Sequence, residues 1–369
     1  GANEAPPSDE RCLGHPCQVP PPPPADPSKG LSPYVVPLPE NVVAMPVPAD
    51  NPLTHAGVHL GRHLFYDPLL SGNDQQSCAS CHVQARSFTD PRPQSLGAEG
   101  APVKRNSMAL VNLAWTAPYF WDGRVSTLEE LVLQPIQRPD EMNQDLDTLV
   151  RELAAHPAYP ALFEAAFPGE PVGPDTLRKA LSQFLRTLVS FNSPADLVGR
   201  PDAGLTPLQM EGMKLAAGGL PRNGPAIPDL CDACHAHAAG LEEPRGMGLF
   251  TVSEPRGNGL PLGEDLGVFA LSDVDADKGR FVVPTIRNLS VTAPYMHDGR
   301  FETLEEVVAH YDSAIEYGPG LDEPLGRGGE ALRLGMNAAE RKALAAVMEA
   351  FTDPVFLETP AFADPGRPQ

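Results

Sequence analysis

Apolar residues recur every three or four positions in several stretches after residue 51, a spacing that places them on one face of a helix. The clearest stretch is 174–191, where Leu177, Leu181, Phe184 and Leu188 share a face. Helices are predicted in this way over residues 57–66, 127–133, 147–155, 174–191, 206–217 and 337–351. No stretch alternates apolar and polar residues as a half-buried strand does, so the predicted fold class is mainly α.

Polar residues indicate where some of these helices begin and end. Residues 126–129, Ser-Thr-Leu-Glu, resemble a capping box and predict a helix start. Asp147 is the predicted N-cap of the helix 147–155, and Asp67 followed by Pro68 ends the first helix. Residues 218–230 and 236–280 are rich in Gly, Pro and Asp, so we expect long loops there.

Residues 1–50 differ from the rest, with five consecutive prolines at 20–24 and many further prolines. This composition predicts an extended, polyproline-like arm that lies on a surface or reaches outward and has little core of its own. The segment begins at Gly1 and does not resemble a signal peptide, so we expect a mature or trimmed form. In an oxidising compartment Cys12 and Cys17 would form a disulfide; two free thiols are the alternative.

The 369 residues are enough for two domains with cores of their own. The formal net charge of -21 argues against nucleic acid or an anionic membrane as the main partner. No apolar run is long enough to span a bilayer, so no transmembrane segment is expected.

Four of the six cysteines fall into two C-x-x-C-H pentapeptides, at 78–82 and 231–235. This spacing is the attachment signature of a c-type haem, in which two thiols bind the porphyrin and the histidine ligates the iron. A redox-active C-x-x-C pair and half of a zinc site are the alternatives, but zinc needs four ligands and each pentapeptide supplies at most three. The predicted haem-binding residues are Cys78, Cys81, His82, Cys231, Cys234 and His235. Covalent haem attachment normally takes place outside the cytoplasm, which predicts a periplasmic protein.

Residues 116–132 and 292–308 are largely identical, with T-A-P-Y-x-x-D-G-R followed by T-L-E-E. Arg105-Asn106 precedes the first copy and Arg287-Asn288 precedes the second. Each haem motif is therefore followed by the same loop and helix, which predicts two cytochrome c-like lobes related by an internal repeat.

The copies differ where an iron ligand is expected. Three residues beyond the shared helix the first lobe has Pro135, which cannot ligate iron, and the second has Tyr311, which can. His310 is the competing donor beside Tyr311, and a buried core tyrosine is the other interpretation. The first iron is therefore expected to be open, with Pro135 on its distal side.

An open haem that reacts with peroxide needs a group that moves a proton between the two oxygens. Glu141 lies six residues after Pro135, and no histidine occurs between His82 and His156. Glu141 is the candidate, although a solvated loop carboxylate is the ordinary alternative. Trp121, replaced by a histidine in the second copy, is a candidate electron relay or else a core residue.

The sequence resembles the bacterial di-haem cytochrome c peroxidase and MauG superfamily over about residues 51–352. The segments that carry the resemblance are the two pentapeptides and residues 64–71, 120–124, 135–137 and 283–288. The composition and the repeat divide the chain into the arm (1–50), a first haem lobe (51–200) and a second haem lobe (201–369). The resemblance implies that the first haem reacts with peroxide and that the second transfers electrons. It also implies that Glu141 is the distal catalytic glutamate and that Trp121 lies between the haems.

The same resemblance implies one Ca²⁺ between the lobes, held by backbone carbonyls of Asn106, Thr292 and Pro294. Tyr311 is typical of the MauG-like branch, because ordinary peroxidases of this family carry methionine there. The histidine that closes the first site in many peroxidases is absent from residues 95–100. Leu131 stands where many members have glutamine, so we expect a less polar distal pocket.

The predicted function is a periplasmic di-haem c enzyme that uses hydrogen peroxide to oxidise Trp or Tyr residues of a partner protein through high-valent iron. The alternative is a di-haem peroxidase that reduces hydrogen peroxide with electrons from a small cytochrome or cupredoxin. A third hypothesis is an electron-transfer protein without enzymatic activity. The identity of the partner and the oligomeric state do not follow from the sequence.

Overall fold

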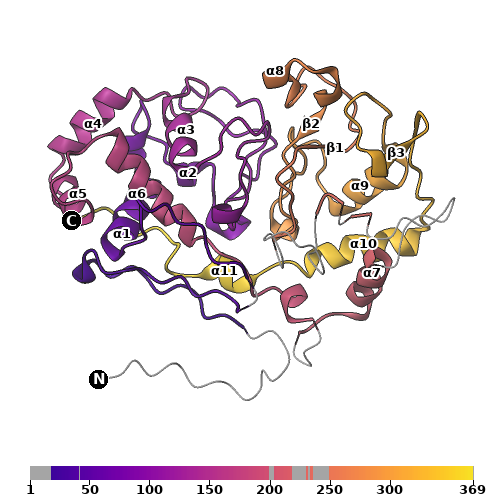
Figure 1. The fold of residues 1–369 in the computed structure, drawn as a ribbon, viewed down its shortest axis with the longest axis horizontal. Coiled ribbons are helices and arrows are strands. Elements are labelled where there is room, and N and C mark those ends of the chain that lie inside the picture. The colour runs from indigo at the N-terminus through magenta and orange to yellow at the C-terminus, as the bar shows by residue number, and fades with distance from the viewer. Residues whose placement is uncertain are drawn as a thin grey trace.

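A computed structural model describes residues 18–40, 42–198, 203–217, 230–231, 233–235 and 249–368. Most of the helices gather in two bodies, one built mainly from the first half of the chain and one from the second (Figure 1). The mainly α fold class is confirmed. Cys12 and Cys17 lie outside the described residues, so their predicted disulfide stays a prediction.

The first body is organised around the packing of one helix pair. Its helices are α1 (His55–Tyr66), α2 (Leu128–Leu131), α3 (Leu133–Gln137), α4 (Leu146–Ala155), α5 (Tyr159–Ala166) and α6 (Pro174–Thr187). Helix α1 lies so close to α6 that a Cβ at Gly61 would collide with the carbonyl oxygen of Ala180. Leu60, Leu64 and Phe184 are fully buried beside this contact. The pair supports one wall of the cavity described below.

The second body packs α7 (Pro207–Ala217) against α10 (Ala338–Glu349), again through a glycine, Gly212, that touches the Ala343 carbonyl. Helix α9 (Leu304–Ala309) continues into a π-helix, His310–Ala314, and α8 (Phe269–Ser272) lies in a loop. Two antiparallel pairs of two-residue strands are present, β1 (Arg256–Gly257) with β2 (Arg280–Phe281), and β3 (Gly326–Arg327) with β4 (Glu330–Ala331). These strands are too short to show as a sequence pattern.

The C-terminal segment returns to the first body (Figure 1). Helix α11 (Pro354–Glu358) and the residues after it place Phe356 and Phe362 in the first core. The Arg62 guanidinium donates to the Ala363 carbonyl at 2.6 Å, and the Tyr66 hydroxyl donates to the Phe362 carbonyl at 2.7 Å. The chain therefore crosses between the bodies more than once, and the division at residue 200 stays a prediction.

The described part of the Pro-rich arm lies on the surface of the other residues. Val19 and Asn192 exchange two hydrogen bonds, and Trp115 Nε1 donates to the Val43 carbonyl at 3.1 Å. Apolar residues of the arm pack against the segment that leaves α6 and against Leu249 of the second half. The arm thus covers a place where residues from both halves meet.

Several predicted boundaries were wrong by a few residues. The N-cap of α4 is Asp145, whose side chain accepts from Thr148 N, whereas Asp147 falls in the first turn. The N-cap of α2 is Thr127, which accepts from Glu130 N, so the capping position is one residue later than the Ser126 pattern predicted. Helix α6 ends at Thr187, four residues before the predicted end. Among the described residues no helix is long and apolar enough to cross a membrane.

Candidate functional site

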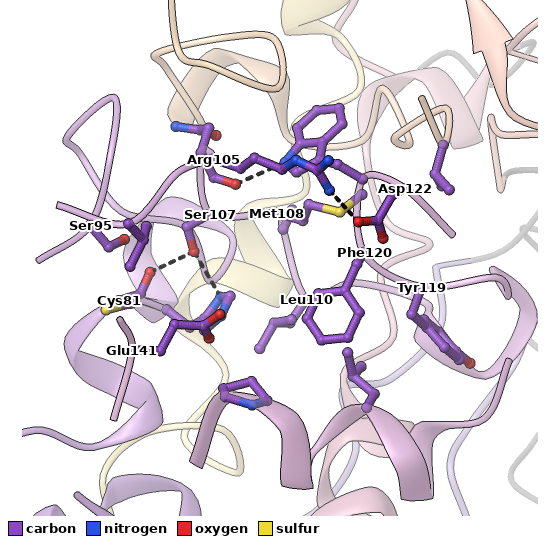
Figure 2. A pocket seen from close by; sticks show the side chains of 18 of the residues that line it. Cys81, Ser95, Arg105, Ser107, Met108, Leu110, Tyr119, Phe120, Asp122 and Glu141 are labelled. Atoms are coloured by element: carbon purple, nitrogen blue, oxygen red, sulfur yellow. Dashed lines mark hydrogen bonds and ion pairs between the residues drawn. The ribbon is translucent and has the colours of Figure 1, made fainter. Parts of the chain in front are cut away.

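The first pentapeptide forms one tight turn. Cys78–Ser80 is a 3-10 helix, and His82 N donates to the Cys78 carbonyl at 2.9 Å. The Ser107 hydroxyl donates to the Cys81 carbonyl at 3.0 Å and joins the turn to the next segment (Figure 2). The turn brings both thiols and the imidazole together, as attachment of one haem requires.

The imidazole of His82 is oriented by a backbone carbonyl. Its Nδ1 lies 2.7 Å from the Phe88 carbonyl oxygen, and because a carbonyl only accepts, Nδ1 carries the proton. This arrangement leaves Nε2 available as an iron ligand. Phe88 adopts a φ of 59°, which turns its carbonyl inward. Burial lowers the pKa of His82, so the ring is held neutral, as ligation requires.

A cavity of about 1000 Å³ opens beside this turn. The residues predicted for the first haem site that line it are Cys78, Cys81, His82, Trp121, Leu131, Pro135 and Glu141. Residues of the second half, among them Asp265 and Val283, line it as well, so the cavity lies where the two bodies meet. Pro135 and Leu131 supply no ligand atom, and the thiols, the imidazole and the space fit a c-type haem with an open distal side.

Glu141 is held at this cavity by its own backbone. Its N–H donates to the Arg138 carbonyl at 3.0 Å, and its carbonyl accepts from Ala98 N at 2.6 Å. The side chain lies beside Cys81 and Ser107 (Figure 2) and pairs with Arg138 Nε at 2.9 Å. Burial raises the pKa of Glu141, and the positive charge of Arg138 opposes that rise. The carboxyl therefore keeps its proton to a higher pH than an exposed glutamate does, which is a property that a proton carrier needs.

Trp121 is buried at the contact between the two halves. Its Nε1 donates to the Asn106 carbonyl at 2.8 Å, and its own carbonyl accepts from Val282 N at 2.8 Å. The ring centroids of Phe281 and His297 each lie 6.4 Å from its own, edge to face. The indole thus contacts aromatic residues of the second half while lining the first cavity.

The second pentapeptide repeats the first turn. His235 N donates to the Cys231 carbonyl at 2.8 Å, as His82 N does to Cys78. Burial lowers the pKa of His235, and the carbonyl of Phe250 opposes this lowering. Phe250 has a φ of 53°, close to that of Phe88. The two phenylalanines therefore share a backbone conformation, but Nδ1 of His235 has no hydrogen-bond partner among the described residues, whereas Nδ1 of His82 has the Phe88 carbonyl.

Tyr311 lies near the thiols of Cys234 and Cys231. It sits in the π-helix after α9, a geometry that often occurs at functional sites. Burial raises the pKa of Tyr311, the two thiols add to the rise, and the Asn258 side chain opposes it. His310 instead points its Nε2 at the Asn258 carbonyl oxygen, 3.0 Å away. Of the two candidate donors, Tyr311 is the one that neighbours the second haem motif.

Comparison with known proteins agrees with this geometry. A family model described as di-haem cytochrome c peroxidase matches residues 55–203. The methylamine utilization protein MauG of Methylorubrum extorquens is 35% identical over 312 residues, covering 83% of this chain and 81% of that protein. The chain belongs to the di-haem cytochrome c peroxidase family. It is therefore a peroxidase-type oxidoreductase that uses hydrogen peroxide and carries two c-type haems, and the predicted resemblance is confirmed.

Other members of the family divide between activities. The cytochrome c551 peroxidase of Pseudomonas aeruginosa is 33% identical over 277 residues, covering 74% of this chain and 75% of that protein. A crystal structure of a MauG-like protein associated with microbial copper homeostasis superposes with a TM-score of 0.75 at 30% identity, covering 89% of this chain and 99% of that one. Identity alone therefore does not separate the MauG-type activity from the cytochrome c peroxidase activity.

The repeated loops of this family member share backbone geometry as well as sequence. Ala117-Pro118 and Ala293-Pro294 are both cis. The Tyr119 hydroxyl donates to the Leu113 carbonyl and the Tyr295 hydroxyl to the Leu289 carbonyl, each at 2.7 Å. Asn112 and Asn288, at φ 55° and 61°, begin the 3-10 turns before the loops. The sequence analysis paired Asn288 with Asn106, because each of them follows an arginine. The structure shows that this pairing is wrong and that Asn112 is the counterpart of Asn288.

The predicted calcium ligands approach one another through the backbone. Asn106 N donates to the His297 carbonyl at 2.7 Å, which places Asn106 against the loop that contains Thr292 and Pro294. The side chains of Asn106 and Thr292 are buried. No interaction of the described residues tests a calcium ion, so this site stays a prediction.

Proposed function

We propose that this member of the family is a MauG-like enzyme, which uses hydrogen peroxide to oxidise tryptophan or tyrosine residues of a partner protein in the periplasm. The observation that carries the proposal is the exchange of Pro135 for Tyr311 at one position of the repeat, with Tyr311 beside the second haem motif. A phenolate oxygen disfavours reduced iron relative to a thioether. Such a ligand suits a haem that stores oxidising equivalents better than one that accepts electrons from a cytochrome.

Glu141 performs the proton transfer in this proposal. It receives a proton from one oxygen of hydrogen peroxide and returns it to the other, so that water can leave. The raised pKa of Glu141 brings its proton affinity closer to neutral pH than that of an exposed glutamate. Leu131 and Pro135 line the same cavity without offering a competing proton or ligand. When bound, the two haems supply peroxide activation at the first site and charge storage at the second.

Trp121 couples the two sites in this proposal. Its N–H donates to the Asn106 carbonyl, which is too weak a base to take the proton. Loss and return of an electron at the indole therefore involve no net proton transfer. The ring regains its starting state after each electron has passed between the two sites. A calcium ion bound by carbonyls of Asn106, Thr292 and Pro294 would hold the loop that positions Trp121.

The test is addition of hydrogen peroxide to the fully oxidised protein without any reductant. We expect the spectra of both haems to respond. Trp121→Phe should reduce the response of the second haem while the first still consumes peroxide. Trp115→Phe is the matched control, because Trp115 is the only other tryptophan and its N–H contacts the arm.

A response that requires prior reduction of one haem would contradict the proposal. It would favour the peroxidase alternative, which the 33% identity to a cytochrome c551 peroxidase keeps open. In that case a reduced small cytochrome or cupredoxin should be oxidised rapidly in steady state. A peroxide-dependent mass increase in a co-purified periplasmic protein would instead support the MauG-type reaction.

A further inference from the structure

The loop of residues 95–101 lies directly against the turn that carries Glu141. Ala98 N donates to the Glu141 carbonyl at 2.6 Å. A Cβ at Gly97 would collide with the Asp140 carbonyl oxygen, which belongs to the peptide unit that joins Asp140 to Glu141. Gly97 does not have a positive φ, so lack of space rather than the backbone angle excludes a side chain there. The loop and the backbone of Glu141 therefore have to move together.

Asn73, which precedes the first pentapeptide, holds this loop from its other side. Its Oδ1 accepts from Gln75 N and from the Ser71 hydroxyl, both at 3.0 Å, so Nδ2 is the end of the amide that faces the loop. Nδ2 donates to the Ala98 carbonyl at 2.7 Å. Ala98 thus binds Asn73 through its carbonyl and Glu141 through its N–H.

A second side chain of the same segment, Gln76, strengthens this connection. Its Nε2 donates to the carbonyls of Leu96 and Gly97 at 3.0 and 3.2 Å. Residues 71–76 lead almost directly into the haem-binding turn 78–82. These hydrogen bonds therefore fix the loop relative to the residues that attach the first haem, and catalytic groups depend on support of this kind for their precise position.

We propose that Asn73 and Gly97 are positioning residues, which act through the loop 95–101 to set the place of the Glu141 carboxyl in the first haem cavity. The inference rests on the proposed function, since it assumes that Glu141 carries the proton during peroxide cleavage. Residues 95–100 contain no histidine that could ligate iron. In this inference the loop contributes support for the proton carrier instead of a ligand.

The test measures the rate constant with which the fully oxidised di-haem protein reacts with hydrogen peroxide in the absence of a reductant. Asn73→Asp keeps the oxygen that accepts from Gln75 N, and it replaces the donor to Ala98 by a carboxylate oxygen that repels the carbonyl. We expect the rate constant to fall by about ten- to a hundredfold, as a small misplacement of a catalytic group does. Haem content and circular dichroism check that the variant is folded and loaded.

Gly97→Ala tests the same connection from the loop side. Its methyl group pushes on the peptide unit before Glu141, so the rate constant should fall in the same way. Gly100→Asn is the matched control in the same loop, because a Cβ there meets nothing within 4 Å and asparagine tolerates its φ of +78°. This control should react at the wild-type rate.

The deciding measurement repeats Asn73→Asp in a Glu141→Gln background. If Asn73 acts through Glu141, the change should cost less than about twofold there, because the group that it positions is already gone. An equal loss in both backgrounds would mean that Asn73 acts on folding or haem attachment, and the inference would be wrong. A wild-type rate for Asn73→Asp also overturns it. If Glu141→Gln itself reacts at the wild-type rate, Glu141 carries no proton and the proposed function loses its proton carrier as well. A loss in Glu141→Gln without one in Asn73→Asp removes only the positioning role.

Discussion

Glu141 shows how a single residue acquires chemistry from its surroundings. Its carboxyl is buried enough that its pKa rises, yet it retains one partner, Arg138, that limits the rise. Asp140 adds a second negative charge beside it and pushes the pKa further upward. These two neighbours therefore act in opposite directions on the same proton.

Glu141→Gln should lower kcat/KM for peroxide by about two to four orders of magnitude, the usual contribution of a positioned proton carrier. The carboxylate must be ionised to accept a proton, so wild-type activity should rise with pH through the raised pKa of Glu141. The variant should lose this rise and keep both haems. The measurement is peroxide consumption against pH, with haem content as the control.

The neighbours of Glu141 supply a matched pair of variants for the same profile. Arg138→Met removes the charge that lowers the pKa of Glu141, so the rise of activity with pH should move to higher pH. Asp140→Asn removes the charge that raises the pKa of Glu141 and frees Arg138 from its ion pair with Asp140. The rise of activity with pH should therefore move to lower pH. If the pH profiles of both variants shift in the same direction, a group other than Glu141 controls the rise of activity with pH.

At this scale the sequence pointed to residues such as His82 and Glu141 by their type, and the structure places both at the first cavity, while their roles stay predictions. It missed those that act through backbone conformation. The Phe88 carbonyl lies against the His82 imidazole while Phe88 adopts a positive φ, and phenylalanine gives no such signal in a sequence.

At the scale of elements, close packing of helices shapes the first cavity. Helix α6 contributes Leu181 and Leu185 to the cavity wall, and α1 presses on the other side of α6 at Ala180. Gly61 is the residue that permits this approach, because any side chain there meets backbone rather than a flexible side chain. The position of the wall thus depends on a residue that does not touch the cavity.

Gly61→Ala should destabilise the protein by about 1–3 kcal/mol, the usual cost of overpacking, despite the better helix propensity of alanine. Because α6 must shift, the visible spectrum of the first haem should change as well. Gly263→Ala is the control, since a Cβ there meets nothing within 4 Å. Thermal unfolding and absorbance check both; equal melting temperatures for the two variants would contradict the close approach.

The positions of helices could be predicted where the apolar face was long, as in α6. The prediction failed where tertiary contacts determine whether a helix forms. The sequence did not predict helix α3, because Pro135 lies inside the helix and Pro139 follows shortly after its last residue. The loop after Pro139 folds back and forms hydrogen bonds with the helix, which no sequence pattern indicates. Helix α11 was missed because its five residues gain their stability from the first core rather than from their own pattern.

At the scale of the molecule, the repeat predicted two similar haem environments, whereas it could not predict how their bodies join. The junction depends on side chains without counterparts in the repeat. Arg105 forms two hydrogen bonds with Asp265 from the other half of the chain, at 2.5 and 2.8 Å, and a third with Asp122. The guanidinium therefore links the loop that carries Trp121 to the second half.

A double-mutant cycle on Arg105→Ala and Asp265→Ala should give a coupling energy of about 1–2 kcal/mol in urea unfolding. The two residues are 160 positions apart, so their contact exists only in the folded protein. The control is Arg300 with Asp298, a pair of similar exposure, 27% and 30% against 19% and 29%. Its members are two residues apart and can pair in the unfolded chain too, so its coupling should be below about 0.5 kcal/mol. Equal coupling in the two cycles would mean that the Arg105 contact does not hold the halves together, and Trp121 would then need another support at the junction.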